Sequence, residues 1–470
     1  MLSARLYARR ARTPDMLYSN PLSKLDARWN PIPASWERQV ASSEERVAKF
    51  LKRLLEHRTA LEVAQSLSAP SPQHASRIPG GSSVSLSAMN KRWDMIPHSA
   101  EGQRALLPED AKSELASYQN HIENCIGAVR LPVGIAGPLR VRGMFASGDY
   151  YVPLATTEAA LVASYSRGAQ VITEAGGCVS VLLNEGVSRT PGFAFRSLVS
   201  AGLFSLWCID HSNELKTAAA QTSAHAELAD LGVAVEGNHV YLLLEFTTGD
   251  ASGQNMATIA AQAVCNFIRE NSPLKPEYSF VEANFSGDKK ATAHSFTTVR
   301  GKKVSAEVTL PAELLEHRLH TTPKQLEQYW KMSAIGAIQS GSIGVQGHFA
   351  NALAALYIAC GQDPACVAES AVGVTRMELD PQGDLYASVT LPSIMVGTVG
   401  GGTALPTQRA CLEIMGLAGA GHARALAEVC GALALAGEIS LTSAICANEF
   451  SRAHQKLARG RQALQNTDNG

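Results

Sequence analysis

The sequence predicts an α+β protein, and three observations indicate this class. At about 150 residues per domain, the 470 residues correspond to about three domains. Hydrophobic residues make up 46% of the chain and charged residues 18%, a globular composition with enough apolar side chains for a sizeable core. Residues 192–281 alternate strand-like and helix-like segments, whereas the later segments are rich in alanine and glycine and favour helices. We therefore expect a large helical or α+β domain that contains a smaller inserted domain.

The inserted domain is predicted from the order of its segments. Apolar runs predict strands at 193–195, 233–235, 240–246 and 278–281, and longer segments predict helices at 212–231 and 255–270. Strand, helix, strand, strand, helix, strand is the order of the split βαβ, or ferredoxin-like, fold, in which helices cover one face of an antiparallel sheet. No Gly-x-Gly-x-x-Gly sequence follows a strand and opens a helix, so the sequence does not predict a Rossmann domain.

The other elements are expected in chain order. An amphipathic helix at 36–65 and a linker rich in serine, proline and glycine at 66–87 precede a short helix from Glu109. A turn-rich segment at 131–138 then leads to a strand pair at 139–142 and 150–153. The next helix is capped by Thr156 or Thr157 and has Glu158 in its first turn. Later elements are an uncharged, buried helix pair within 332–362, a strand and loop at 385–408, and final helices at 423–437 and 438–459.

Domain boundaries follow from these elements. The expected parts are a largely flexible extension at 1–88, a small helical segment at 89–150, a large domain at 151–191 and 282–460, the inserted domain at 192–281, and a flexible tail at 461–470.

Charge, cysteine content and hydropathy exclude several classes. The 41 basic and 42 acidic residues leave no surplus positive charge for binding nucleic acid. Nine cysteines without a Cys-x-x-Cys pair indicate reduced, mostly buried thiols and no metal site. The uncharged stretch at 332–362 is too polar and too rich in glycine for a membrane span, so we expect a soluble protein without a transmembrane anchor. The first fourteen residues contain four arginines and no acid, which fits a mitochondrial transit peptide or an ordinary basic terminus, and thus the mitochondrial matrix or the cytosol.

Four residues are candidates for acid-base chemistry, and each also has a simpler interpretation. Adjacent lysines at 289 and 290 point to different sides of the chain, so Lys289 can stabilise a negative oxygen in a cleft, or both can belong to a solvated turn. Glu158 lies in an uncharged window that suits a general acid, or it can be an ordinary glutamate at a helix start. Asp363 precedes a proline, as many residues at helix ends do. Histidine is well suited to donate a proton near neutral pH, but His454 can equally be a surface residue.

Seven segments together resemble the catalytic portion of the HMG-CoA reductase family, in the form found in eukaryotes, over roughly residues 90–460. Their agreement in the same order makes a chance match implausible. The segments are 123–127 (ENCIG) with 132–139 (PVGIAGPL), 155–164 (ATTEAALVAS), 249–256 (GDASGQNM), 288–290 (DKK), 357–363 (YIACGQD), 397–403 (GTVGGGT) and 437–441 (GEISL).

The resemblance implies a four-electron reduction of 3-hydroxy-3-methylglutaryl-CoA (HMG-CoA) to mevalonate and CoA in isoprenoid or sterol biosynthesis. By similarity, Lys289 donates to the thioester oxygen and Glu158 supplies a proton when the aldehyde intermediate is reduced. Asp363 is expected to hydrogen-bond to both and tune them. His454, on a mobile C-terminal helix, would protonate the departing CoA thiolate.

The resemblance also implies binding residues and partners. Residues expected at the substrate are Arg189, Asp288, Lys290, Lys331, His348 and Asn351, and those expected at the cofactor are Asp250, Ser252, Gly253, Asn255 and Met256. The family leads us to expect NADPH, bound by the inserted domain in a non-Rossmann manner, with NADH as an alternative. The family's site spans a subunit interface that includes residues 123–127, so a homodimer or homotetramer is implied.

Four departures from the family pattern keep alternatives open. Ser252 and Gln254 replace methionines, Glu282 replaces a serine near the substrate, Ala453 replaces a serine before the histidine, and Ala224 occupies the position of an arginine that often binds the 2′-phosphate of NADPH. These departures motivate a second hypothesis, a non-catalytic paralogue that binds CoA esters or inhibitors as a decoy or partner subunit. A purely structural dimerisation protein is a third hypothesis, and it would not require all four catalytic positions to be filled.

Overall fold

The computed structural model describes residues 59, 62, 77–97, 99–107 and 114–448. The chain divides into two compact units, Met1–Arg77 and Ile78–Gly470, and all elements discussed below belong to the second. The helix expected at 36–65 lies almost entirely outside the described residues, and His454 and the tail at 461–470 lie wholly outside them.

Three short helices open the second unit: α3 (Leu86–Trp93), α4 (Ala100–Leu106) and α5 (Leu115–Tyr118). The side chains of Ser85 and Ser99 accept backbone N–H groups and cap α3 and α4. Arg92 is buried on α3 and donates to four carbonyl oxygens, including that of Cys125 at 2.6 Å. One guanidinium group thereby holds the loops around this small helical segment together.

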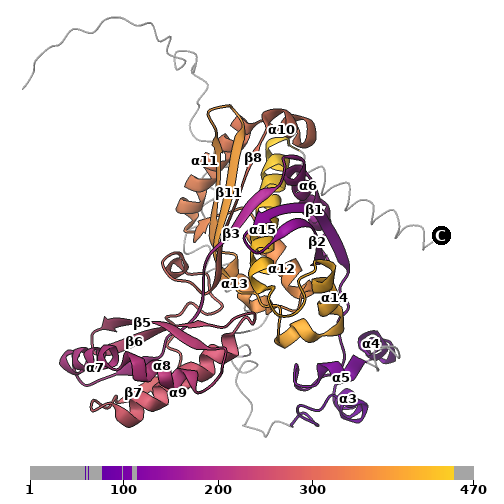
Figure 1. Ribbon diagram of the computed structural model, residues 1–470. Coiled ribbons are helices and arrows are strands. Elements are labelled where there is room, and N and C mark those ends of the chain that lie inside the picture. The colour runs from indigo at the N-terminus through magenta and orange to yellow at the C-terminus, as the bar shows by residue number, and fades with distance from the viewer. Residues whose placement is uncertain (1–58, 60–61, 63–76, 98, 108–113, 449–470) are drawn as a thin grey trace, which may run out of the picture. The chain divides into compact units, whose positions relative to one another are not determined.

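A mixed sheet forms the centre of the large domain. Its strands are β2 (Ser147–Ala155), β1 (Val133–Gly143), β3 (Cys178–Arg189), β8 (Gly301–Leu310), β11 (Leu385–Ile394), β10 (Gly373–Leu379) and β9 (Gly344–Val345), in that spatial order. The pairs β1–β3 and β9–β10 are parallel and the others antiparallel. The sheet covers a long helix, α15 (Ala423–Cys446), which contacts β3, β8 and β11 (Figure 1).

Within the described residues, α15 is the one helix that is long and apolar enough to cross a membrane by length and composition, but 89% of its apolar window is buried inside the fold. Its buried Glu428 accepts the backbone N–H groups of Phe145, Ala146 and Leu182. Its second buried acid, Glu438, accepts those of Gly347 and His348. Buried carboxylates with several donors are satisfied, so α15 functions here as a core helix that anchors surrounding loops.

Further helices complete the large domain: α6 (Leu161–Glu174), α10 (Ala312–Leu319), α11 (Pro323–Ser340), α12 (Phe349–Ala359), α13 (Val367–Ser370) and α14 (Pro406–Ile414). Of these, α6, α10, α11 and α12 pack against α15, and α12 also contacts α14.

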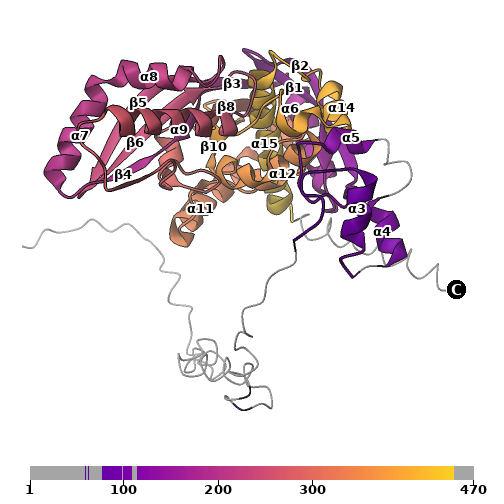
Figure 2. The same cartoon turned by 90° about the horizontal axis from the view of Figure 1, so that it is seen from below.

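The inserted domain consists of β4 (Gly192–Ala194), α7 (Leu198–Asp210), α8 (Ser212–Ala220), β5 (Glu227–Glu236), β6 (His239–Thr247), α9 (Gln254–Asn271) and β7 (Tyr278–Phe280). Its antiparallel strands lie in the order β7-β4-β6-β5, and the helices cover one face of the sheet (Figure 2). This arrangement confirms the predicted ferredoxin-like order and the α+β class.

Several predicted boundaries are wrong, each for a local reason. Helix α6 begins at Leu161 after Ala160, which has a left-handed φ of +71°, so Glu158 lies in the preceding loop and not in the first helical turn. Residues 133–138 belong to β1, which tolerates its glycines and proline through a bulge between Ala136 and Leu139.

Three helix predictions are also wrong. Within the described residues, the two final helices expected at 423–437 and 438–459 form one continuous helix to Cys446, because Gly437 is buried against Tyr165 and does not interrupt it. The helix expected at 212–231 ends at Ala220, and α7 was not predicted. The pair expected within 332–362 is only half buried, since α12 is buried and the second half of α11 is exposed.

Candidate active site

A cavity of about 630 Å³ lies where the start of α9 faces the large domain. Its walls come from the segments that precede α9, follow β7, follow α12 and follow β11. The lining residues include Arg189, Ser252, Gly253, Gln254, Asn255, Met256, Asp288, Lys289, Gln362, Asp363, Gly400, Gly401 and Gly402. Two catalytic candidates, two substrate candidates and four cofactor candidates therefore share one cavity.

Lys289 and Asp363 form an ion pair in this cavity, with 2.8 Å between the lysine Nζ and a carboxylate oxygen. Lys289 has a left-handed φ of +55°, which directs it away from Lys290, whose Nζ binds the carbonyl of Asp288 at 2.8 Å. The hydrogen bond that Lys289 donates to Asp363 raises the pKa of Lys289. Burial alone would raise the pKa of Asp363, but hydrogen bonds from Lys289 and the Ala365 N–H outweigh it and lower that pKa. The Lys289 ammonium is therefore charged at neutral pH and can donate hydrogen bonds.

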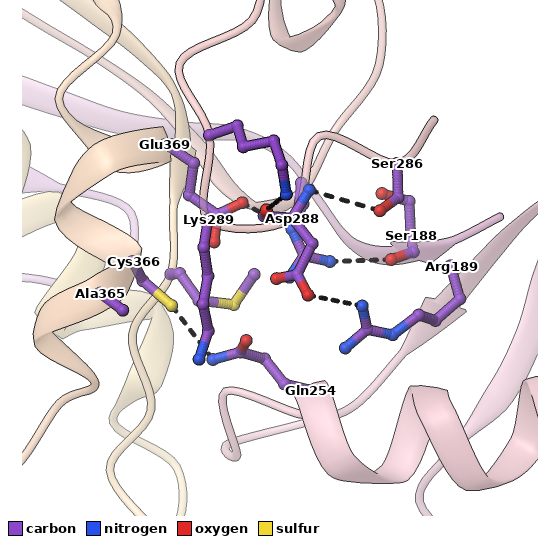
Figure 3. Close-up of polar contacts among 12 residues, drawn as sticks. Ser188, Arg189, Gln254, Ser286, Asp288, Lys289, Ala365, Cys366 and Glu369 are labelled. Carbon is purple, nitrogen blue, oxygen red and sulfur yellow. Dashed lines mark hydrogen bonds and ion pairs between the residues drawn. The ribbon is translucent and has the colours of Figure 1, made fainter. Parts of the chain in front are cut away.

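A buried charge network supports the loop that carries Lys289. Asp288 pairs with Arg189 at 2.7 Å and with Arg300, which in turn binds Glu369 at 2.5 Å (Figure 3). Arg300 and Glu369 are almost fully buried, and burial raises the pKa of Glu369. For Asp288, the opposing effect of burial is outweighed by Arg189 and Arg300, which lower its pKa. The network fixes the 288–290 turn against β3 and β8.

Glu282, which replaces a serine near the substrate in the family pattern and would repel an anionic substrate, does not line the cavity. Its carboxylate accepts from Arg189 at 3.4 Å, from the Ser286 hydroxyl at 3.0 Å and from the Asn284 N–H at 2.8 Å. Arg189 also donates to Thr258 on α9 at 2.9 Å. The negative charge of Glu282 is thus partly neutralised on the outer side of Arg189, away from the cavity.

The cofactor candidates lie at the start of α9, except Asp250. The first turn of this 18-residue helix presents backbone N–H groups without intrahelical partners, and Gly253 precedes it with a φ of +76°. Asp250 faces another way: its carboxylate accepts the N–H groups of Gly421 and Ala423 at 2.7 and 3.1 Å and caps the start of α15. Asp250 is therefore placed to anchor the loop that bears Ser252 to Met256.

A second cluster lies at the N-terminal end of α12. Asn351 donates to Glu158 at 3.4 Å, and His348 at the helix cap lies 3.4 Å from the Tyr165 hydroxyl through its Nδ1. Burial lowers the pKa of His348, although Glu438 and Glu158 partly oppose this. Among the described residues, Glu158 contacts Asn351 and not Lys289 or Asp363. Glu158 is exposed in the single chain.

Lys331 lies apart from both groups, on α11. Its side chain is 59% exposed and pairs with Glu327 one turn earlier at 3.0 Å. Exposed apolar side chains follow it on the same helix, with Met332, Ile335 and Ile338 at 75, 60 and 76%. A face of this kind marks an interaction surface more often than a solvated one.

Sequence reasoning missed the residues that support the site. Arg300 and Glu369 lie outside the segments that were singled out, and a single buried arginine gives no sequence signal. Eight of the nine cysteines are buried, as predicted. Cys366 lies in the short turn that Asp363 caps, where it accepts a hydrogen bond from Gln254 at 3.1 Å.

An ammonium held against a carboxylate, within a cavity that also receives a helix N-terminus and glycine backbone, is the arrangement of an enzyme that stabilises negative charge on a substrate oxygen beside a phosphate-bearing ligand. The model of the hydroxymethylglutaryl-coenzyme A reductase family matches residues 88–459. The chain therefore belongs to this oxidoreductase family, as the sequence motifs predicted.

Relatives and solved structures agree with this assignment. The 3-hydroxy-3-methylglutaryl-coenzyme A reductase of Pyrococcus abyssi is 43% identical over 72% of this chain and 85% of its own length. That of Aeropyrum pernix is 44% identical over 73% and 83%, and that of Fusarium fujikuroi is 38% identical over 82% of this chain but 40% of its own length. The class II enzyme of Streptococcus pneumoniae, solved with NADPH in open conformations, shares the fold at a TM-score of 0.57 and 18% identity, covering 77% of this chain and 99% of that one.

Proposed function

We propose that this chain catalyses the NADPH-dependent reduction of HMG-CoA to mevalonate and CoA. The observation that supports this best is the Lys289–Asp363 ion pair in a cavity wall that faces the cofactor candidates at the start of α9. Family membership supplies the reaction, and the cavity supplies a charged donor where a thioester oxygen must gain negative charge.

Each catalytic residue has a distinct task in this proposal. Bound NADPH supplies hydride. Lys289 donates a hydrogen bond to the substrate oxygen as negative charge develops there, and Asp363 holds its ammonium in place. Glu158 supplies a proton when the aldehyde is reduced, and Asn351 orients Glu158. His454, outside the described residues, would protonate the CoA thiolate.

Binding roles follow the two walls of the cavity. Residues 192–281 would bind the cofactor and residues 151–191 with 282–460 the HMG-CoA. The N-terminal turn of α9 suits a pyrophosphate. Gly400 and Gly401 line the same cavity, and a Cβ at either would meet nothing within 4 Å, so their backbone is open to a ligand. Ala224 lies on a neighbouring cavity with His225 and Glu227, so NADH is a necessary comparison in any assay.

We also propose that two subunits share each site. Within one chain, Glu158 lies at the start of α12 beside Asn351, whereas Asp363 follows the end of that helix. Eight residues of α-helix separate Asn351 from Ala359, or about 12 Å of rise at 1.5 Å per residue. One thioester cannot contact both ends, so Glu158 and Lys289 require a second subunit to meet at one substrate. The exposed apolar face of α11, next to Lys331, supports a homodimer or a dimer of dimers.

Pathway and compartment follow from the same proposal. Mevalonate feeds isoprenoid synthesis, including sterols, and the basic first residues make the cytosol and the mitochondrial matrix the compartments to examine.

The test follows nicotinamide absorbance at saturating HMG-CoA, with NADPH and NADH in parallel. We expect oxidation that depends on HMG-CoA and is lost in Glu158→Gln. A folded protein that binds HMG-CoA and oxidises neither cofactor would favour the non-catalytic paralogue, for which Ser252 and Gln254 in the cofactor segment are the supporting departures.

A further inference from the structure

Gln254 links the start of α9 to the catalytic ion pair. It is the first residue of the helix and lines the cavity with Lys289 and Asp363. Its side-chain amide donates to the Cys366 sulfur at 3.1 Å (Figure 3). The Cys366 backbone N–H in turn donates to the Asp363 carbonyl oxygen at 3.1 Å, within one short 3-10 turn. One side chain from the inserted domain therefore holds the turn that carries Asp363, the partner of Lys289.

The ion pair needs such a support. The side chains of Lys289 and Asp363 are 42 and 37% exposed, and an ion pair with that much solvent contact orients its partners weakly. Within its own loop, the Asp363 carboxylate accepts only the N–H of Ala365, at 3.0 Å, among the described residues. The Gln254 amide adds a hydrogen bond from a different element to Cys366, at the other end of the same turn. A turn that is held from two sides positions its carboxylate better than one that is held from its own loop alone.

Cys366 extends this link into the buried core. Its sulfur accepts from Gln254, and the residue is fully buried directly before α13, the helix that carries Glu369. Glu369 pairs with the buried Arg300. The backbone carbonyl of Gln254 accepts from Thr258, which binds Arg189. Gln254 is thus held at both ends, by the buried Cys366 through its side chain and by Thr258 through its backbone. Its direction is set by the protein and not by solvent.

We propose that Gln254 is a positioning residue, whose amide binds Cys366, holds the Asp363–Cys366 turn against the start of α9, and so aligns the Lys289 ammonium from the cofactor side of the cavity. This inference rests on the proposed reductase function. Methionine, which the family usually has here, matches glutamine in length but has no N–H donor, so this chain uses a polar contact in place of an apolar one.

The test compares Gln254→Met with Gln262→Met in the full-length protein. Gln262 lies on the same helix, and its amide contacts Asn266 outside the cavity, so it is a matched control. We expect kcat with HMG-CoA to fall about tenfold in Gln254→Met, with KM for HMG-CoA and NADPH changed by less than about twofold. The acidic limb of the kcat profile should move to higher pH, because an Asp363 that is held less firmly loses part of its hydrogen bond from Lys289, which lowers its pKa. The control should match the parent, and thermal melting should show that both variants are folded.

A measurement that does not depend on catalytic activity can test the role of Gln254 independently of the proposed reductase function. NMR titration of Lys289 should give a lower pKa in Gln254→Met than in the parent, because a misaligned Asp363 stabilises the ammonium less. An unchanged kcat, acidic limb and Lys289 titration would overturn the proposal. A raised KM for NADPH at unchanged kcat would also overturn it, since Gln254 would then be a cofactor contact. A parent protein without reductase activity would refute the proposed function, and the Lys289 titration would still decide the role of Gln254.

Discussion

The two halves of the candidate site differ in how completely one chain builds them. Lys289 and Asp363 line a cavity and are supported by buried arginines and carboxylates. Glu158 is exposed in a loop, contacts Asn351 at 3.4 Å, and lies at the other end of α12. The charges of the Lys289 half are therefore all supported by other residues of the same chain, whereas the Glu158 half is exposed to solvent. The difference supports our proposal that a second subunit completes the open half.

The same contrast appears in the surfaces next to each half. The turn that carries Lys289 is fixed by the buried Arg300 and Glu369. The α11 helix that carries Lys331 instead exposes Met332, Ile335 and Ile338. Oligomers bury apolar surfaces that a single chain leaves exposed, so we expect these exposed residues of α11 to contact a second subunit.

The largest expected effect comes from removing the charged donor. Lys289→Ala should lower kcat about 100- to 1000-fold, the usual cost of losing one donor to a developing oxyanion. Steady-state kinetics would measure this, with Lys216→Ala on the exposed face of α8 as the control. Because Lys289 is partly exposed, the melting temperature should hardly change. Normal turnover in a folded Lys289→Ala protein would refute its assigned role.

A loss of stability is expected when the support under Lys289 is broken. Asp288→Asn leaves Arg189 and Arg300 without their shared carboxylate and should cost about 3–5 kcal/mol of unfolding free energy. Denaturant unfolding would measure it. Asp149→Asn removes an exposed pair with Arg140 and should cost less than about 1 kcal/mol. Equal losses of unfolding free energy in the two variants would show that the buried network contributes no more to stability than an exposed ion pair.

The open half can be disrupted through the α11 face. Ile338→Asp should weaken subunit association at least about tenfold, because burying an unpaired carboxylate in an interface is costly. Analytical ultracentrifugation would detect the monomer, and activity should decline with it on dilution. Leu206→Asp changes a similarly exposed apolar residue on α7 and should leave the oligomer intact. An Ile338→Asp protein that remains oligomeric would exclude α11 from the interface.

The pH dependence should be the mildest effect. The pKa of Asp363 is lowered, so its charge is lost only as pH falls below the ordinary range of an aspartate. The pKa of Lys289 is raised, so its proton is lost only as pH rises above the ordinary range of a lysine. Stopped-flow measurement of thioester reduction should show no loss attributable to this pair between these limits. A limb near neutrality that persists in Glu158→Gln and in His454→Gln would contradict the assignment.

Sequence reasoning predicted the order of strands and helices in residues 192–281, because alternating strands and amphipathic helices give a local signal, but it missed α7 and extended α8 too far. It failed at α6 because Ala160 adopts a left-handed conformation that composition does not reveal. The motif segments predicted that Lys289 and Asp363 act together, and the structure brings them to 2.8 Å. The supporting network of Arg300 and Glu369 depends on contacts between distant segments, and no spacing rule indicates it.

The most direct test of the shared site is complementation between two inactive chains. Glu158→Gln and Lys289→Ala proteins, each inactive alone, would be co-expressed with different tags and assayed with HMG-CoA and NADPH. If each site takes Glu158 from one subunit and Lys289 from the other, half of the dimers are mixed and each has one intact site. The pool should then regain about a quarter of the parent activity. If both residues act within one chain, every site in a mixed dimer is defective. A pool that contains mixed dimers but regains no activity would therefore contradict the account.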